Sequence, residues 1–80
     1  MALVPIPADE WTEVVTTVGN TIVQNMDSHF PVYITTADPT GLDLNNGILL
    51  PSLAAITFPE TVTVQAASIH RPSVVSYMAI

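Results

Sequence analysis

Two serine–histidine pairs are the residues of this 80-residue chain best suited to nucleophilic chemistry. Ser28 directly precedes His29, and Ser68 lies two positions before His70. A nucleophilic site needs the hydroxyl beside a base that a third group orients. Neighbouring side chains on a strand point to opposite faces, and neither pair occupies a G-x-S-x-G turn. We therefore interpret both pairs as ordinary loop residues and expect that the protein is not an enzyme.

Carboxylates offer two further candidate sites. Asp9, Glu10 and Glu13 cluster near the start of the chain, beside a segment that we expect to be an extended arm. Paired carboxylates can serve acid–base catalysis, but a cluster on a mobile arm favours a solvated acidic group.

The segment 37–46 (ADPTGLDLNN) concentrates oxygen ligands of the kind that calcium prefers. The run from Asp43 to Gly47 departs from the EF-hand order, and no glutamate follows at the required distance. Its beginning, ADPTG, fits a type I turn with proline at the second position. We interpret the segment as turn structure, with an ion or ligand site as the open alternative, and we predict no cofactor. The candidate ligands are Asp38, Asp43, Asn45 and Asn46.

The charge balance excludes whole classes of partner. Arg71 is the only Lys or Arg against seven acidic residues, and the net charge is −6. Nucleic acids and anionic membranes both require cations on the protein surface, so we expect neither as a partner. We expect Arg71 to pair with a carboxylate within the chain or across a subunit boundary, or else to face solvent.

The chain is unusually apolar for a small domain. Hydrophobic residues make up 49% of it and charged residues 10%, whereas about a quarter of a typical globular chain is charged. Part of the surface should therefore be covered by another molecule, and a homo-oligomer, with a trimer favoured, fits this shortage.

Short β-branched and alternating segments separated by turn signals predict an all-β fold. Residues 1–10 carry two prolines and are expected to form an extended arm, followed by a single β-domain over residues 11–80. Residues 11–17 and 21–26, joined by Gly19-Asn20, are expected to form a hairpin. The spacing predicts a compact antiparallel sandwich or small barrel of six to seven strands. The expected strands are 11–17, 21–26, 32–36, 48–50, 54–58, 61–67 and 73–80.

One face of each strand should form the core, although a slip of one residue exchanges the two faces. The expected core consists of Val15, Ile22, Val32, Ile34, Leu49, Phe58, Val62, Val64, Val75 and Tyr77. Strands that are apolar on both faces predict contacts with neighbouring subunits. Trp11 is expected to be a core residue or a strand cap, with an interface anchor as the alternative. The interface candidates are Val4, Ile6, Trp11, Leu50, Arg71, Tyr77, Met78 and Ile80.

Several runs of residues, taken in order, resemble small virion proteins of tailed bacteriophages. These runs are WTEVVTT, GNTIVQN, PVYI, ADPT, NGILL, FPETVTVQAAS and SVVS, which together span roughly residues 11–79. This chain departs from the usual pattern at Asp27–Phe30, where a glycine-rich loop is common, and at Pro51–Leu53, where P-G-E is common.

The resemblance implies a structural component of a virion. The favoured component is an oligomeric capsid decoration (cement) protein that binds the major capsid protein or other virion proteins. Tail, neck or head-fibre base proteins are related alternatives. A carbohydrate- or receptor-binding β-module is the alternative from another class. No secretion signal or membrane-spanning run is visible, so we expect assembly in the host cytoplasm and a final location in the virion.

Overall fold

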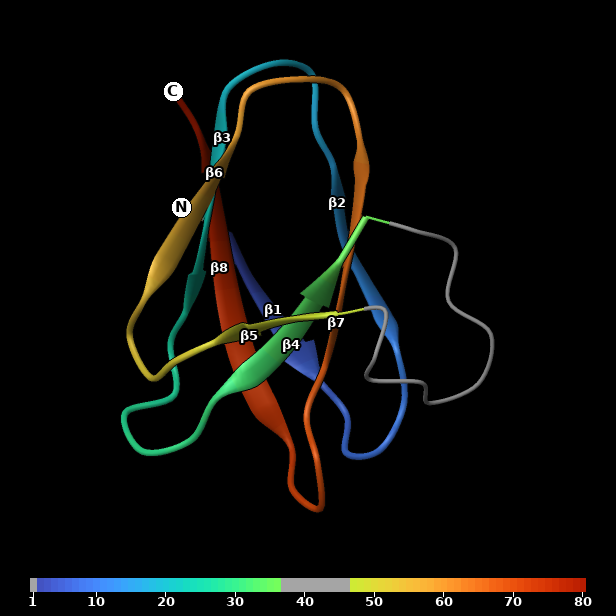
Figure 1. The fold of residues 1–80 in the computed structure, drawn as a ribbon, viewed down its shortest axis with the longest axis vertical. Coiled ribbons are helices and arrows are strands. Elements are labelled where there is room, and N and C mark those ends of the chain that lie inside the picture. Colours follow the sequence, from blue (N-terminus) through green and yellow to red (C-terminus); the bar gives the residue numbers. More distant parts are fainter. Residues whose placement is uncertain (1, 37–46) are drawn as a thin grey trace.

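Eight antiparallel β-strands form two four-stranded sheets in the computed structural model, which describes residues 2–36 and 47–80 (Figure 1). This arrangement confirms the all-β sandwich, whereas the small barrel and the count of six to seven strands are wrong. The strands are β1 (Ala2–Ile6), β2 (Thr12–Thr16), β3 (Thr21–Asn25), β4 (Val32–Thr35), β5 (Ile48–Leu50), β6 (Ala55–Phe58), β7 (Thr63–Ala67) and β8 (Ser73–Ala79).

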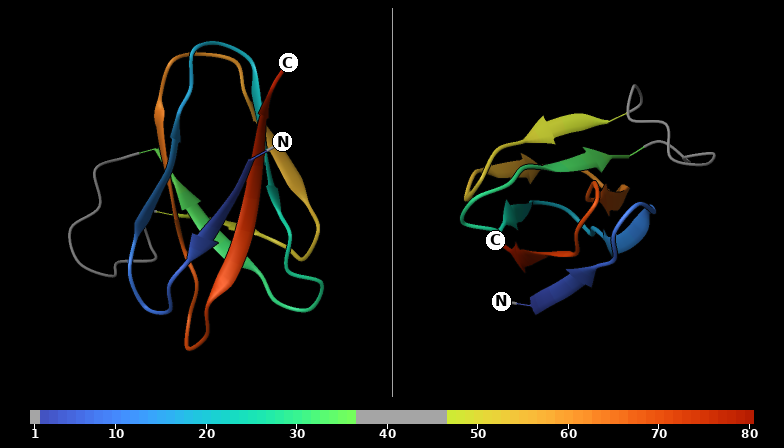
Figure 2. Two further views of the ribbon diagram at one scale, coloured as in Figure 1. Left: turned by 180° about the vertical axis from the view of Figure 1, so that it is seen from behind. Right: turned by 90° about the horizontal axis from the view of Figure 1, so that it is seen from below.

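The strand order is that of a jelly roll. One sheet has the order β1-β8-β3-β6 and the other has the order β2-β7-β4-β5. The pairs β1–β8, β2–β7, β3–β6 and β4–β5 are those of one long hairpin that has been folded into two layers. Only β4 and β5 are both consecutive in sequence and paired, so every other connection passes from one sheet to the other. The right-hand view of Figure 2 shows β4 and β5 in one layer and β1 and β8 in the other.

Connections run side by side in pairs where the folded hairpin changes sheet (Figure 1). At the first pair, Asp9 N donates to Ser68 O at 2.7 Å, and His70 N donates to Asp9 Oδ1 at 2.9 Å. At the second, Thr17 N donates to Val62 O at 2.8 Å, and Val62 N donates to Thr17 Oγ1 at 2.9 Å. These hydrogen bonds pair backbone groups that lie in the connections and therefore have no partner within a sheet.

A buried asparagine holds the third pair of connections. Asn25 is fully buried, and its backbone N donates to Ala54 O at 2.9 Å. Its side-chain Nδ2 lies at hydrogen-bonding distance from three carbonyl oxygens, those of Phe30 (2.9 Å), Leu50 (3.2 Å) and Pro51 (3.2 Å). Asn25 thus ties the β3–β4 connection to the β5–β6 connection, and its burial is tolerated because its amide is satisfied.

The extended N-terminal arm is not present. Residues 2–6 form β1, which pairs along its whole length with β8, and Ile6 is fully buried in the core. The prediction failed because Pro5 argued against a strand. β1 is an edge strand of its sheet, and an edge strand tolerates a proline.

The expected hairpin of residues 11–17 and 21–26 is also wrong. β2 and β3 lie in different sheets, so the Gly19-Asn20 turn connects the two layers. Gly19 has a φ of +103°, a backbone conformation that residues with a side chain rarely adopt. The turn signal was therefore real, but it does not specify whether the chain returns beside itself or crosses to the opposite layer.

The core lies between the sheets and matches the expected one in four positions. Val32, Ile34, Val64 and Val75 are buried as predicted, and Val15, Phe58, Val62 and Tyr77 pack against the core while remaining partly exposed. In three strands the neighbouring residue is buried in place of the predicted one. Val14, Val23 and Leu50 are inside, where Val15, Ile22 and Leu49 were expected. The remaining core residues are Ile6 and Ala66, while Ala67 is buried on the outward side of β7, opposite Tyr33.

Candidate interaction surface

The outer side of the β1-β8-β3-β6 sheet carries no ionisable residue. Register and alternation along the strands place Leu3 beside Ser76, Pro5 beside Val74, and Met78 beside Ile22. Exposure is high for a strand surface, at 63% for Leu3 and 50% for Met78. We call this surface the uncharged face; it consists of Leu3, Pro5, Ile22, Gln24, Ala55, Thr57, Val74, Ser76 and Met78.

Of the polar side chains on the uncharged face, Gln24 is hydrogen-bonded within the chain, Ser76 is buried and Thr57 is exposed. Gln24 Nε2 donates to Leu53 O at 2.9 Å, which links the face to the β5–β6 connection. Ser76 lies in the middle of the sheet between Leu3 and Gln24 and is almost completely buried. The accessible surface is therefore mainly that of Leu3, Val74 and Met78. An apolar patch of this kind is typical of a contact with another protein.

The outer side of the other sheet is different in character. Glu13 lies beside Gln65, and the hydroxyls of Thr16 and Thr63 are hydrogen-bonded at 3.1 Å. We call this surface the Trp11 face, because the indole of Trp11 packs over part of it. Its outward residues are Glu13, Thr16, Tyr33, Thr35, Leu49, Thr63 and Gln65.

Trp11 packs on the Trp11 face at Gly47. A Cβ atom at Gly47 would lie 3.0 Å from Trp11 Cη2 and 3.4 Å from Tyr33 Cβ, so a larger residue there would press against the indole. The indole Nε1 is buried and has no hydrogen-bond partner among the described residues. Trp11 therefore covers part of the sheet within its own chain.

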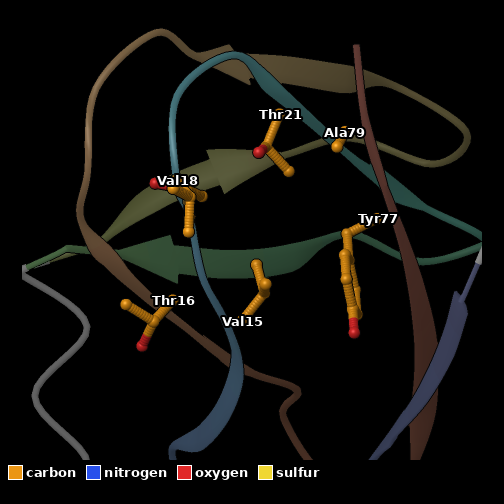
Figure 3. A pocket seen from close by; sticks show the side chains of 7 residues that line it. Val15, Thr16, Val18, Thr21, Tyr77 and Ala79 are labelled. Carbon is orange, nitrogen blue, oxygen red and sulfur yellow. The ribbon is translucent and has the colours of Figure 1, made fainter.

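An apolar cavity of about 160 Å³ opens at the end of the sandwich where β2 leads into β3. Figure 3 shows Val15 and Tyr77 facing this space from β2 and β8. A cavity of roughly this volume accommodates one benzene-sized group. It contains no charged side chain that could orient a polar substrate. The lining residues are Val15, Thr16, Thr17, Val18, Thr21, Tyr77 and Ala79.

Asp27 organises the β3–β4 connection at the opposite end. Its Oδ1 accepts hydrogen bonds from His29 N at 2.9 Å and from Phe30 N at 3.1 Å, and Ser73 Oγ donates to its Oδ2 at 3.3 Å. The bond from His29 N is the main reason that the pKa of the Asp27 carboxyl lies below its usual value, and the charge of Arg71 contributes to the same lowering.

Arg71 is held within its own chain. Its guanidinium carbon lies 4.1 Å from the centroid of the Phe30 ring, which is a cation–π contact. Asp27 is close enough for its pKa to respond to the Arg71 charge. Of the outcomes expected for Arg71, the structure favours a contact within the chain, made chiefly with an aromatic ring.

The two serine–histidine pairs do not form a catalytic arrangement in the described part of the chain. Ser28 Oγ lies 3.0 Å from His29 Nδ1, so the expectation that these side chains diverge is wrong, because they lie in a loop and not on a strand. Both residues are exposed, and the Asp27 carboxylate accepts the backbone N–H of His29 and not its ring. Ser68 is buried, whereas the side chain of His70 is 89% exposed.

The acidic candidates likewise form no metal site among residues 2–36 and 47–80, where no group of three His, Cys, Asp or Glu residues converges. Asp9 is fixed between two connections and does not lie on a mobile arm. The candidate ligands in segment 37–46, namely Asp38, Asp43, Asn45 and Asn46, lie outside the described residues.

The eight interface candidates separate into three groups by burial. Met78, Ile80 and Arg71 are exposed, while Val4, Trp11 and Tyr77 are half-buried. Ile6 and Leu50 are core residues, so their side chains contact neighbours within the sandwich. Sequence reasoning missed Leu3 and Val74, whose exposed apolar side chains complete the uncharged face. The available signal was the alternation in SVVSYMA, which places Val74 and Met78 on one side of β8.

Comparison with protein families, curated proteins and solved structures gives no match for this chain. No helix in the described ranges is long and apolar enough to cross a membrane.

Proposed function

We propose that this protein is a structural component of a tailed-phage virion, namely an oligomeric decoration protein that binds the major capsid protein. The observation that carries the proposal is the uncharged face, an exposed apolar sheet surface on a chain whose net charge is −6. A surface of this kind is expected where a protein works through contacts with other proteins.

The fold is compatible with this proposal by analogy only. Jelly rolls are common in viral capsid domains, but they also occur in lectins and cupins. The jelly-roll fold therefore favours a virion protein, and the choice among these classes depends on the uncharged face. The resemblance of the sequence to small virion proteins supports the same choice.

A carbohydrate-binding module is less well supported by the described side chains. Sugar recognition would need freely exposed aromatic rings. Trp11 and Tyr33 are half-buried on the Trp11 face, and Arg71 occupies one side of the Phe30 ring. Nothing in the described residues brings a set of polar groups around an open aromatic surface.

Co-sedimentation with capsids tests the proposed function. The probe is a capsid assembled from the major capsid protein encoded in the same genome, mixed with the purified full chain. We expect saturable binding at a fixed number of copies per capsid, because decoration occupies equivalent lattice positions and many modest contacts add through avidity. Absence of binding to the capsid, together with specific binding on a glycan array, would replace this proposal with the carbohydrate-binding alternative.

A further inference from the structure

We propose that a second copy of this chain docks on the uncharged face, so that two sheets meet face to face about a two-fold axis. The inference rests on the proposed function for its biological setting. It assigns the uncharged face to the contact within the oligomer, which leaves the other surfaces for the capsid, and it replaces the trimer favoured from composition with a dimer. A contact of this type uses the same patch on both subunits and closes as a dimer.

The distribution of charge favours a second copy over a different partner. The acidic residues in the described ranges all lie outside the uncharged face, in connections or on the Trp11 face. Two copies that each carry a net charge of −6 repel one another wherever their carboxylates approach. In a two-fold contact, a residue on the axis meets its own equivalent and other residues meet different residues of the same patch, so a patch without carboxylates brings no acidic side chains together. The acidic residues concerned are Asp9, Glu10, Glu13, Asp27 and Glu60.

The polar groups of the face allow it to be covered at little cost. Gln24 already donates to Leu53 O at 2.9 Å, and Ser76 is 2% exposed before any partner arrives. Covering the face therefore removes apolar surface from water at Leu3, Val74 and Met78, together with the exposed Thr57. Burial of that surface is favourable, and no charged group must be desolvated.

The β1 edge of the sheet is unsuited to pairing with a strand of another molecule. Pro5 lies in the edge strand β1, and a proline in an edge strand opposes the addition of a further strand. The left-hand view of Figure 2 shows β1 and β8 nearest the viewer, on one of the two broad sides. The whole molecule measures 31 by 27 Å along its two longer axes.

Two substitutions of matched exposure test the proposal. Met78 on the uncharged face is 50% exposed, and Leu49 on the Trp11 face is 51% exposed. Met78→Glu and Leu49→Glu therefore add the same charge at equally exposed apolar positions on opposite sides. Met78→Lys also places a charge at the contact, but it reduces the net negative charge of the chain. Dissociation by this variant would therefore be caused by burying a charge at the contact and not by repulsion between two acidic chains. Mass is measured by light scattering and sedimentation velocity, and circular dichroism with a thermal melt checks that each variant folds.

We expect the wild-type chain and Leu49→Glu to be dimers, and both Met78 variants to be folded monomers with at least tenfold weaker association. A monomeric wild-type chain, a trimer, or equal dissociation by Leu49→Glu would overturn the inference. Capsid co-sedimentation of the wild-type chain judges the proposed function separately. A monomer that still decorates capsids would leave the proposed function standing and remove only the dimer.

Discussion

The two outer faces of the sandwich differ in what covers them. On the Trp11 face, the chain covers part of the sheet itself, because the indole packs against Gly47 beside Tyr33. Glu13 keeps a charge at this surface, and Leu49 remains exposed. On the uncharged face, the described chain supplies neither a covering side chain nor a charge over Leu3, Val74 and Met78. A chain of 80 residues buries a smaller fraction of its surface in the core than a larger domain does, so a large share of its apolar residues lies on the outer faces.

The comparison shows that a small fold can carry its charged residues away from one exposed apolar face. The acidic residues in the described ranges lie in the connections and on the Trp11 face. The uncharged face is free of the desolvation cost that buried carboxylates would impose. The predictions below test how far each side depends on its own residues.

The largest effect is expected from removing residues 1–7, which deletes the β1 edge of the uncharged face. β1 pairs with β8 over five positions and contributes the fully buried Ile6. We expect the truncated chain to lose its cooperative thermal transition, because a core this small cannot spare a strand. Leu3→Ser is the control and should change the free energy of unfolding by less than about 0.5 kcal/mol, since Leu3 is exposed. A truncated chain with the melting temperature of the wild type would contradict this role of β1 and would support the extended arm predicted from the sequence.

The next largest effect concerns Asn25, which links the β3–β4 connection to the β5–β6 connection and so helps to hold the two sheets together. Asn25→Ala leaves the carbonyl oxygens of Phe30, Leu50 and Pro51 without the amide they share. We expect a loss of about 3 kcal/mol in the free energy of unfolding, measured by urea denaturation.

Gln24→Ala is the matched control for Asn25→Ala. Gln24 also donates to a backbone carbonyl oxygen, but its bond is exposed. Its removal should cost no more than about 1 kcal/mol. Equal losses for the two variants would contradict the role given to burial.

A smaller effect is expected on the Trp11 face itself. Gly47→Ala would place a methyl group 3.0 Å from Trp11 Cη2, so the indole must shift. We expect a destabilisation of about 1 kcal/mol and a red shift of the fluorescence of the single tryptophan as it becomes more exposed to water. Association through the uncharged face should not change. An unshifted emission spectrum would show that the indole does not depend on Gly47.

The smallest effect is a pH dependence at the end where Asp27 lies. Because the pKa of Asp27 is lowered in the folded chain from 3.8, its contribution to stability is present above that value. This contribution is lost as the pH falls through the lower pKa of the folded state. Asp27→Asn should therefore be less stable than the wild type near neutral pH and should lose less stability on acidification. Glu13→Gln removes the same charge on the Trp11 face and serves as the control. Identical acid profiles for Asp27→Asn and the wild type would contradict this role.

The sequence located most strands correctly but assigned some of them the wrong face. Strands near 32–35, 48–50, 63–67 and 73–79 follow from β-branched residues between turn signals. The inward face of β3 was misjudged, because Thr21, Val23 and Asn25 appear more polar than the alternating Ile22 and Gln24. Asn25 can be buried only because carbonyl oxygens from two distant connections meet it.

A register shift explains the misassignment in β2. The pairing of β2 with β7 is irregular between Glu13 and Val15, so Val14 is buried while Val15 is only partly covered. A β-bulge of this kind depends on the partner strand and leaves no mark in a short run of valines and threonines. The uncharged face was found in part, through Met78, and was missed at Leu3 because residues 1–10 were expected to be an arm.

The sequence by itself determined the class of the fold, the positions of most turns and the shortage of charge, because these depend on composition and on residues close together in the chain. Only the tertiary structure decided which strands pair, which side of each strand is inward, and that Leu3, Val74 and Met78 share one surface. The physical reason is that the pairs β1–β8, β2–β7 and β3–β6 join residues far apart in the chain. Their register depends on how both sheets fill one common core, which no local pattern encodes.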